Sequence, residues 1–419
     1  MLTQAPKGTK DILPGDVYKW QYLERKFREI AAGYGFLEIR TPVIEHTELF
    51  ERGIGGATDV VEKQMYTFED YGGRSITLRP EGTAGAARAY LEGKLYAGVR
   101  PAKYWYETSC FRYEKPQSGR LREFHQFGVE NFGSHDMLAD AEVIALADEF
   151  LRGLGVAELS LRINSIGCPV CRPVYRKQLM EYLSGHYDAL CDTCKSRYEK
   201  NPLRVLDCKS PVCQGIAAGA PVMLDALCAE CAEDFAALQT GLNAFGVGFE
   251  IDPMIVRGLD YYTKTAFEFV SDRIGAQGTV CGGGRYDHLI RELGGDDVPG
   301  VGFGMGIERL LLVLSESGAE IPAARRPDAL VVFLNEEARG EALRLVKSLR
   351  GAGLIAEIDT AGRNMKGQFK YADRIGARCC AVLGEEELRS REATVKNMET
   401  GEQVRVRFED AASAIGRRD

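Results

Sequence analysis

Three observations in the sequence predict an α+β protein: a mainly antiparallel sheet with helices, a helical Cys-rich insertion and a C-terminal α/β domain. The length of 419 residues exceeds what one ordinary hydrophobic core supports. Eight of the twelve cysteines fall between residues 168 and 231, which marks a separate module. After residue 325 the pattern changes to alternating strands and helices. We expect a first domain over 1–325, with the insertion at about 168–250, and a second over 326–419.

The composition is that of a soluble protein, with 45% hydrophobic and 27% charged residues. The N-terminal segment contains no apolar core of a secretory signal, and no stretch approaches the roughly 18 apolar residues of a membrane span. A net charge of −8 argues against a surface that binds nucleic acid along its whole extent. We expect a cytoplasmic protein without membrane contact, whose nucleic-acid binding would depend on a local basic patch.

In the large domain, periodicity and helix-terminating residues predict the elements in order. Residues 16–34 carry apolar side chains at helical spacing, with Asp16 as the N-cap and Gly33 and Gly35 at the end. The run FLEIRTP predicts a strand that ends at Pro42. Further strands are expected at 103–114, 123–132, 263–270 and 301–306, and a helix at 307–316.

In the last domain, buried strands are expected at DALVVFL, LIAEID and CCAVLG. Helices are expected between them, at EEARGEALRLVKSLRGAG and FKYADRIGA. This alternation predicts parallel strands.

Two of the expected strands flank the polar loop KPQSGRLR and can bring polar side chains onto one face. With a period of two residues, Arg112 and Glu114 share a face at the end of the first strand. On the second strand, the residues that share a face are Phe124, Gln126, Gly128 and Glu130. If the strands pair, a cation, carboxylates and an amide surround a small residue. The alternative is a solvated sheet face, which an isolated hairpin would favour.

The segment GVGFGMGIER is more specific, because Gly302, Gly304 and Gly306 leave one strand face without side chains. Repeated glycine weakens a strand unless something must approach its backbone closely. This face can be the floor of a ligand site, with Arg309 at the start of the next helix. The segment is neither a Walker loop nor a dinucleotide fingerprint. A glycine strand in a tight core is the alternative, and it fits poorly with Arg309.

Three shorter segments add polar residues. Arg257 precedes a tyrosine pair in RGLDYY, and CGGGRYD at 281–287 predicts a glycine-rich turn. RPEGTAG places Glu81 and Thr83 at the entry of a helix. Each segment is common alone, whereas their joint presence in one chain is not.

With these segments in this order, the chain resembles a class II aminoacyl-tRNA synthetase, specifically the bacterial-type histidyl-tRNA synthetase family, over essentially its whole length. The helix 16–34 with FLEIRTP resembles class motif 1, which forms the dimer interface. FRYEKPQSGRLREFHQFGVE resembles motif 2, and GVGFGMGIERLLL resembles motif 3. RGLDYY and GGGRYD are similar to the two histidine-specific signatures, and PEGTAG to the amino-acid-binding turn. The resemblance implies a homodimer that converts L-histidine and ATP to histidyl-adenylate and pyrophosphate, then transfers histidine to the 3′ end of tRNA(His).

The resemblance assigns the arginines to the phosphates of ATP. The histidine carboxylate attacks the α-phosphorus, so fixed cations near the phosphate oxygens would supply most of the catalysis. Arg112 and Arg257 would flank the α-phosphate as catalytic residues. Arg309 would hold the γ-phosphate, with Arg120 as a helper on the mobile loop, and Mg²⁺ would balance the remaining charge.

The resemblance also implies how adenine and histidine are recognised. Glu114 would bind the adenine amino group while Phe124 stacks on the ring. A neutral imidazole offers one donor and one acceptor nitrogen. Glu130 would accept from one and the Tyr262 hydroxyl would donate to the other, with Tyr261 beside them. The residues implied around the amino-acid backbone are Glu81, Thr83, Arg112, Gln126 and Arg257.

The resemblance makes the last domain an anticodon-binding domain. Basic residues there step by three or four positions and would form a stripe on a helix, with Phe369 and Tyr371 available for stacking: Arg363, Lys366, Lys370, Arg374 and Arg378. A solvated charged face, partly in a loop, is the alternative. The family usually reads an extra guanosine at the tRNA 5′ end, and we expect that contact in KPQSGR, at Gln117.

The insertion carries its cysteines in four chelating pairs: Cys168 and Cys171, Cys191 and Cys194, Cys208 and Cys213, Cys228 and Cys231. This spacing suits one or two tetrahedral Zn²⁺ sites. The family at large does not require these cysteines, so the resemblance gives no support for metal. Reduced or redox-labile thiols are the alternative. The other four cysteines are expected to be buried small residues.

Three rival functions can be weighed on the sequence. A catalytically inactive paralogue that regulates ATP phosphoribosyltransferase shares the fold but usually loses the anticodon domain and RGLDYY, and both are present here. A zinc-dependent nucleic-acid-binding protein would leave every motif of the first domain unused. A class II synthetase for another amino acid shares motifs 1–3 but not RGLDYY with GGGRYD.

Overall fold

The structure is a computed structural model that describes residues 3–55, 58–156, 159–273 and 278–416. The chain forms two compact units, Met1–Pro322 and Ala323–Asp419, and each is described by itself. Within the described ranges, no helix combines the length and the apolar character that crossing a lipid bilayer requires.

An eight-stranded sheet organises the first unit, in the order β1-β5-β6-β11-β10-β9-β7-β8. Its neighbours pair antiparallel except for β1 with β5 and β7 with β8, which confirms the mainly antiparallel sheet. The strands are β1 (Leu37–Glu38), β5 (Ala102–Phe111), β6 (Glu123–Phe132), β7 (Leu159–Ser165), β8 (Glu250–Ile251), β9 (Thr263–Ser271), β10 (Thr279–Arg285) and β11 (Gly300–Gly306). A second sheet contains β2 (Ile44–His46), β3 (Tyr66–Glu69) and β4 (Ser75–Leu78).

Helices α1 (Pro14–Gly33), α4 (Leu138–Gly153) and α10 (Ile307–Ser317) share one hydrophobic core with the sheet. Phe27 of α1 stacks on Phe127 of β6 at 4.4 Å between ring centroids. The helix begins at Pro14, which suits a first turn, so Asp16 is not its N-cap but pairs with Lys19 at 2.8 Å. The strand expected in FLEIRTP is also shorter than predicted, because only two of its residues pair with β5.

A second core contains α3 (Thr83–Glu92), α9 (Leu289–Glu292), part of α2 (Thr47–Phe50) and the tyrosines of the predicted site. Two π-helical turns, Glu51–Gly55 and Val60–Gln64, follow α2. This core places the residues of RPEGTAG beside those of RGLDYY, although about 175 positions separate the two segments.

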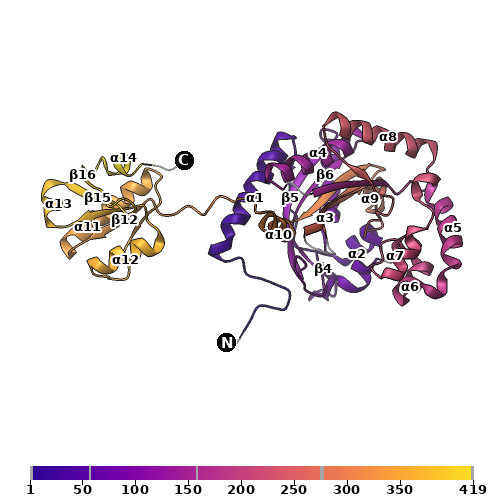
Figure 1. Cartoon of the computed structure of the whole chain (residues 1–419), viewed down its shortest axis with the longest axis horizontal. Coiled ribbons are helices and arrows are strands. Elements are labelled where there is room, and N and C mark those ends of the chain that lie inside the picture. Colours follow the sequence, from indigo (N-terminus) through magenta and orange to yellow (C-terminus); the bar gives the residue numbers. More distant parts are fainter. Residues whose placement is uncertain (1–2, 56–57, 157–158, 274–277, 417–419) are drawn as a thin grey trace. The chain divides into compact units, whose positions relative to one another are not determined.

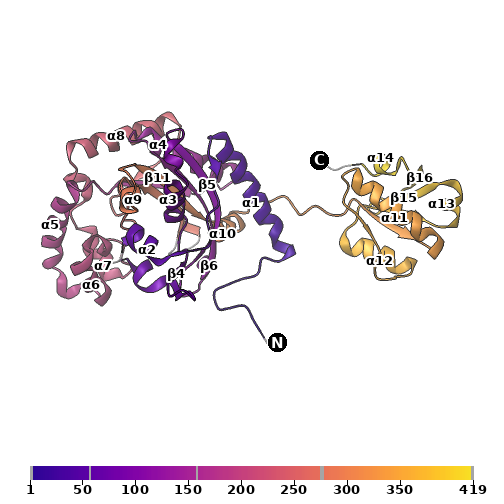
Figure 2. The ribbon, with the colours of Figure 1, turned by 180° about the vertical axis from the view of Figure 1, so that it is seen from behind.

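The insertion is helical, as expected, with α5 (Cys171–Ser184), α6 (Asp192–Lys200), α7 (Pro211–Ala218) and α8 (Ala229–Ala244). Figures 1 and 2 show α5, α6 and α7 together at the end of the first unit that is remote from α1. Helix α8 differs, because its buried Phe235, Leu238 and Leu242 belong to the core around the main sheet. The insertion is therefore anchored to the rest of the unit through α8.

The second unit has a five-stranded sheet in the order β13-β12-β14-β15-β16. The three expected strands pair in parallel, as predicted, and β15 and β16 add an antiparallel hairpin that was not predicted. The alternation in ATVKN and QVRVR on either side of METG is the signal that predicts such a hairpin. The elements are β12 (Ala329–Phe333), α11 (Glu336–Gly351), β13 (Ala356–Ile358), α12 (Met365–Ile375), β14 (Cys379–Leu383), α13 (Glu385–Ser390), β15 (Glu392–Asn397), β16 (Gln403–Arg407) and α14 (Ala411–Ile415).

Candidate active site

A row of three glycines on neighbouring strands forms a flat area on the main sheet. Gly128 of β6 lies opposite Gly304 of β11, which lies opposite Gly282 of β10. A Cβ on Gly128 would lie 2.3 Å from the Tyr106 ring, and one on Gly282 would lie 2.6 Å from the Arg257 guanidinium. The missing side chains therefore let Tyr106 and Arg257 lie directly on the backbone of the sheet.

The turn predicted in CGGGRYD is wrong, because its glycines lie inside β10 between β11 and β9. A Cβ on Gly283 would lie 2.7 Å from the Phe267 ring, on the face opposite Arg257. Three consecutive glycines are typical of a turn. Here they lie in a strand whose backbone is contacted closely on one face by Arg257 and on the other by Phe267.

A cavity of about 230 Å³ lies over the glycine row. Eleven of the residues predicted for ATP and histidine line it: Glu81, Thr83, Arg112, Glu114, Arg120, Phe124, Gln126, Arg257, Tyr261, Tyr262 and Arg309. They come from four segments that are far apart in the sequence. The structure therefore brings together the predicted set, with Glu130 as the exception.

Three arginines crowd one part of this cavity. The Arg112 guanidinium donates to the Pro80 carbonyl at 2.8 Å and lies over the Phe124 ring. Arg309 donates to the carbonyls of Gly119 at 3.0 Å and Thr279 at 2.7 Å, and Arg120 pairs with Glu114. Burial lowers the pKa of Arg309, and the nearby charge of Arg120 lowers it further. Such a group of desolvated cations favours a polyanionic ligand.

Arg257 approaches the cavity from the RGLDYY segment. It pairs with Glu268 and lies over the Tyr262 ring at 5.3 Å. Burial acts to lower the pKa of the Arg257 guanidinium, but Glu268, Tyr262 and Tyr261 together raise it by more. The buried Nε atom has no hydrogen-bond partner in the described part of the chain. Arg257 thus forms an ion pair, as a purely structural arginine would, and also keeps an unsatisfied donor, which suits an additional acceptor from a ligand.

Glu130 is fully buried, and its carboxylate accepts hydrogen bonds from the hydroxyls of Tyr106, at 2.8 Å, and Tyr286. Burial raises the pKa of Glu130 to about 8, although these hydroxyls stabilise the carboxylate. Tyr106 lines the cavity and Glu130 does not. In this structure Tyr106, rather than Glu130, therefore meets the cavity.

Tyr106 and Tyr286 lie at the site but were not predicted from the sequence. Tyr106 lies opposite Gly128, so period two from Arg112 places it on the same face of β5 and could have identified it. Tyr286 belongs to the GGGRYD signature, but the turn predicted there did not indicate which way its side chain points. Tyr261 lies 5.5 Å from the Tyr286 ring, which connects the two signatures.

Glu81 has a structural contact as well as a predicted binding role. Its buried carboxylate accepts from the backbone N–H groups of Thr83 and Ala84, both at 2.8 Å, at the start of α3. Burial raises the pKa of Glu81, while these hydrogen bonds oppose the rise. The helix start thereby fixes a carboxylate at the cavity wall.

Gln117 lies outside this cavity. Its backbone bonds to that of Arg120 at 2.9 and 3.0 Å, which closes the tip of the loop. Gln117 lines a separate hollow together with Lys10, Trp20 and Leu311. The structure thus places the predicted tRNA contact beside the arginine cluster but on another surface.

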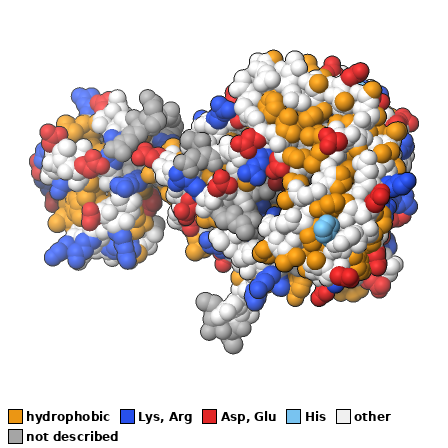
Figure 3. Space-filling view, turned by 45° about the vertical axis from the view of Figure 1, so that its right-hand side comes forward, with side chains coloured by type: hydrophobic (Ala, Val, Ile, Leu, Met, Phe, Trp, Pro, Cys, Tyr) orange, Lys and Arg blue, Asp and Glu red, His pale blue; other side chains and the backbone are white. Residues whose placement is uncertain are grey.

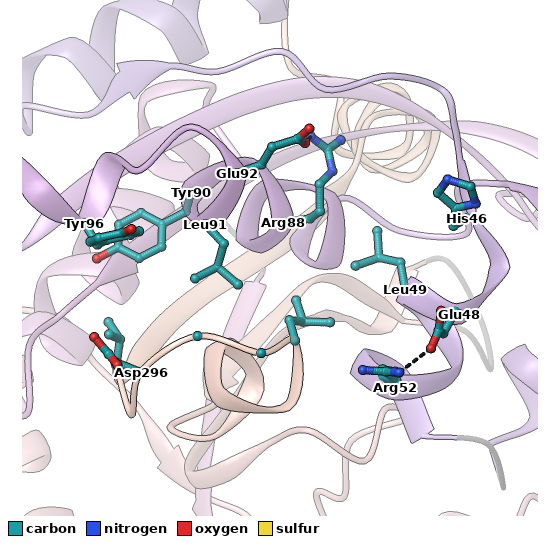
Figure 4. Close-up of a pocket in the computed structure, with 14 residues that line it drawn as sticks. His46, Glu48, Leu49, Arg52, Arg88, Tyr90, Leu91, Glu92, Tyr96 and Asp296 are labelled. Carbon is teal, nitrogen blue, oxygen red and sulfur yellow. Dashed lines mark hydrogen bonds and ion pairs between the residues drawn. The ribbon is translucent and has the colours of Figure 1, made fainter.

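A larger cavity, of about 690 Å³, contains none of the predicted site residues. Figure 4 shows its wall, where Arg52 pairs with Glu48 and Tyr90 lies near Tyr96. The segment that follows motif 1 contributes His46 and Leu49 to this wall.

The eight cysteines of the insertion form two groups of four, in which all sulfur atoms lie within 4.8 Å of one another. The outer pairs form one group, Cys168, Cys171, Cys228 and Cys231. The inner pairs form the other, Cys191, Cys194, Cys208 and Cys213. Either group could hold a metal ion. The sequence left this pairing open.

The basic stripe predicted in the second unit is shorter than expected. Helix α12 carries Lys366, Lys370 and Arg374 on its surface, whereas Arg363 precedes it and pairs with Asp359. Arg378 follows the helix and pairs with Asp328 at 3.5 Å. Asn364 caps α12 through a bond to Gly367, and Gly376 ends it, so the five residues cannot share one helix. Figure 3 shows Lys and Arg side chains gathered along the lower edge of this unit, where Figure 1 places α12.

The mainly antiparallel sheet, the glycine strand followed by Arg309 on the next helix, and the arginine-lined cavity are those of a class II aminoacyl-tRNA synthetase. The family model described as Histidyl-tRNA synthetase matches residues 8–172 and 216–310, and one described as Anticodon binding domain matches 328–418. The chain belongs to the histidyl-tRNA synthetase family.

Relatives named histidine–tRNA ligase cover 99% of the chain. Histidine–tRNA ligase of Caldanaerobacter subterraneus subsp. tengcongensis is 56% identical over 415 residues, 99% of this chain and 100% of the relative. The protein of that name from Acetivibrio thermocellus is 52% identical with the same coverage. Among solved structures, the apo histidyl-tRNA synthetase of S. aureus is similar, with a TM-score of 0.84 and 38% identity over 99% of this chain and 100% of that chain.

Proposed function

We propose that the protein is a histidine–tRNA ligase, which forms histidyl-adenylate and pyrophosphate from L-histidine and ATP and then transfers histidine to the 3′ end of tRNA(His). The observation that carries this proposal is the cavity, where three crowded arginines adjoin a buried set of tyrosines and carboxylates. The cations suit a triphosphate, while the carboxylates suit an amino acid with a hydrogen-bonding ring.

In the first step the carboxylate of histidine displaces pyrophosphate from the α-phosphorus of ATP. Arg112 and Arg257 stabilise the charge that grows on the α-phosphate oxygens, and neither has to reorganise, because Pro80 and Glu268 already hold them. Arg309 and Arg120 hold the γ-phosphate end. Glu114 binds the adenine amino group and Phe124 stacks on the ring. Mg²⁺ would accompany the nucleotide and balance the remaining phosphate charge.

Histidine is selected through its ring nitrogens. Glu130 accepts from the ring N–H once the Tyr106 hydroxyl, which separates it from the cavity in this structure, moves aside. The Tyr262 hydroxyl donates to the other nitrogen, and Tyr286 keeps its bond to Glu130. Glu81, Thr83 and Gln126 receive the α-ammonium group. A buried site of this kind rejects analogues without ring nitrogens, because its polar groups would be left unpaired.

We assign residues 1–325 to catalysis and 326–419 to anticodon binding. Lys366 and Lys370 on α12 contact the tRNA backbone, and Gln117 contacts the extra guanosine at the 5′ end. Arg363 contributes less than the sequence suggested, because Asp359 neutralises it. With tRNA as a partner, we expect the enzyme to act in the cytoplasm.

We also propose a homodimer, formed through motif 1. Three apolar side chains in this segment or directly after it are exposed, with Leu37 at 67%, Ile44 at 54% and Val43 at 38%. Such residues in sequence are typical of a surface that another protein covers. Light scattering coupled to size-exclusion chromatography tests this proposal: a mass near twice 46.2 kDa is expected, and a monomer at micromolar concentration would contradict it.

For the metal that the cysteine spacing predicts, we propose structural Zn²⁺, since tetrahedral sites of four thiolates favour this ion. The family model leaves the stretch between residues 172 and 216 unmatched, and the four inner cysteines lie there. The argument for metal therefore comes from the cysteine groups of this chain and not from the family.

ATP–pyrophosphate exchange with each of the twenty amino acids tests the function. Exchange with histidine alone is expected. Silence with all twenty, in folded protein, would overturn the proposal in favour of a regulatory paralogue. Exchange with another amino acid would overturn the assignment of Glu130 and Tyr262.

A further inference from the structure

The cysteine groups of the insertion adjoin the loop that carries Arg257, Tyr261 and Tyr262. We propose that each group binds one Zn²⁺, and that the two ions hold the insertion as a clamp on residues 257–262, which sets the affinity for histidine. The clamp rests on the proposed function, whereas the two metal sites do not.

The distances between the sulfur atoms match a single tetrahedral ion. The Sγ atom of Cys168 lies 3.7 Å from that of Cys171 and 3.9 Å from that of Cys228. In the second group, Cys191 and Cys208 are 3.8 Å apart. Four Zn–S bonds of about 2.3 Å produce sulfur separations of about 3.8 Å. A disulfide would need about 2.05 Å.

Backbone N–H groups point at the sulfur atoms, as is usual around metal-bound thiolates. In the first group, Cys228 donates to Cys171 at 3.1 Å and Val170 donates to Cys168 at 3.3 Å. In the second group the matching bonds, at 3.3 and 3.4 Å, run from Cys191 to Cys213 and from Ser210 to Cys208.

The insertion needs such a cross-link, because its own elements are short. Helices α6 and α7 have 9 and 8 residues, below the roughly 12–15 at which an isolated helix becomes stable. Cysteines are a large part of the buried side chains in the insertion's core, together with residues such as Leu179 and Val205. A metal ion at each group would supply the stability that this small core lacks.

The first group is tied to the end of the histidine-binding loop. Arg172, next to the ligand Cys171, donates to the backbone carbonyls of Ile166, at 3.2 Å, and Tyr262. Lys264, two residues further, pairs with Glu230 at 2.8 Å, on the helix that carries Cys231. The position of Tyr262 therefore depends on the geometry of the first group.

The second group closes a segment that holds the start of the same loop. Between Cys194 and Cys208, Arg204 donates to the Arg257 carbonyl at 3.1 Å. Asn201 donates to the Asp260 carboxylate, also at 3.1 Å. The loop is thus held from the insertion at residues 257, 260 and 262, and Arg172, Asn201 and Arg204 are positioning residues for it.

Metal analysis of protein purified without chelator tests the two sites. Inductively coupled plasma mass spectrometry is expected to find two zinc ions per chain. Cys191→Ser/Cys208→Ser and Cys168→Ser/Cys228→Ser should each leave one. A ratio near zero in the wild type, or disulfides found by thiol titration, would overturn the sites, and iron in place of zinc would overturn the identity of the metal.

The clamp is tested by Arg204→Gln, which leaves all eight cysteines in place. Two zinc ions should remain, while KM for histidine rises about tenfold, since a charged hydrogen bond to the loop is lost. KM for ATP should change by less than about twofold. The control is Arg176→Gln, at an exposed position on α5 of the same insertion. An unchanged KM for histidine would overturn the clamp.

These readouts separate the two proposals. Zinc content is measured without substrate, so it decides the metal sites whatever the activity. A wild type without histidine-dependent exchange would overturn the proposed function and the clamp together. A normal exchange with an unaltered Arg204→Gln variant would overturn the clamp alone.

Discussion

The charged residues of the cavity and those of helix α12 differ in how firmly they are held. Arg112 and Arg309 donate to backbone carbonyls, Arg257 pairs with Glu268, and all three are at least partly buried. Lys366 and Lys370 are exposed, and within the described residues neither forms an ion pair.

This difference matches two functions of charge toward nucleotides, which are catalysis in the cavity and tRNA binding on α12. Charge that stabilises a transition state must already be in position, because reorganisation during the reaction costs rate. Charge that binds a long polyanion acts through counterion release and tolerates mobile side chains. Substitutions in the cavity should therefore act on the chemistry, and substitutions on α12 on tRNA affinity and its salt dependence.

The largest effect is expected from Glu130→Ala. It removes the proposed acceptor of the imidazole N–H and leaves the Tyr106 and Tyr286 hydroxyls without their partner. We expect kcat/KM for histidine in pyrophosphate exchange to fall by about 10³-fold or more. Titration with ATP serves as the control, because its KM should change little. Normal exchange in this variant would refute the role of Glu130.

Arg257→Ala should follow in size. Loss of one fixed donor to a developing anion costs about 10²–10³-fold in kcat. Single-turnover adenylate formation is the measurement, with Arg344→Ala on the exposed face of α11 as the matched control. If Arg257 served only as the salt-bridge partner of Glu268, the variant would lose thermal stability but keep its single-turnover rate.

Eleven residues of the cavity were predictable because they stand in short segments that resemble the motifs of a known family. The glycine alternation in β11 predicted a strand face without side chains, and the neighbouring glycines of β6 and β10 extend it. The strand in CGGGRYD was not predictable from one sequence, because consecutive glycines are typical of turns. Only the closeness of Arg257 and Phe267 explains why a strand has glycines there.

Contacts between residues far apart in the chain could not be predicted from the sequence. The spacing of the cysteines predicted chelating pairs, but which pairs combine depends on how α5 to α8 fold back. The prediction of a five-residue basic stripe was wrong for a local reason. Asn364 and Gly376 mark the two ends of the helix, and the spacing of the basic residues does not reveal these ends. Tyr106 was missed although its face was known, because no motif marked it.

Lys366→Ala/Lys370→Ala should have a smaller and different effect. We expect tRNA affinity to fall about tenfold at low salt, with the slope of log affinity against log salt reduced by about two. Exchange without tRNA should be unchanged. An unaltered affinity and slope would remove α12 from the tRNA interface and weaken the contrast with the cavity.

The last effect concerns the pH dependence of stability that the buried Glu130 carboxyl imposes. Its carboxyl has an ordinary pKa of 4.5 and a pKa of about 8 in the fold, raised by burial. Between these values the folded protein binds the extra proton, so the free energy of unfolding falls as pH rises through this window. Glu130→Gln removes the titration and should flatten the fall between pH 5 and 8, measured by urea unfolding. If the free energy of unfolding fell equally with pH in both proteins, Glu130 would be ionised in the fold. Its two tyrosines would then hold the carboxylate, as Glu268 holds Arg257.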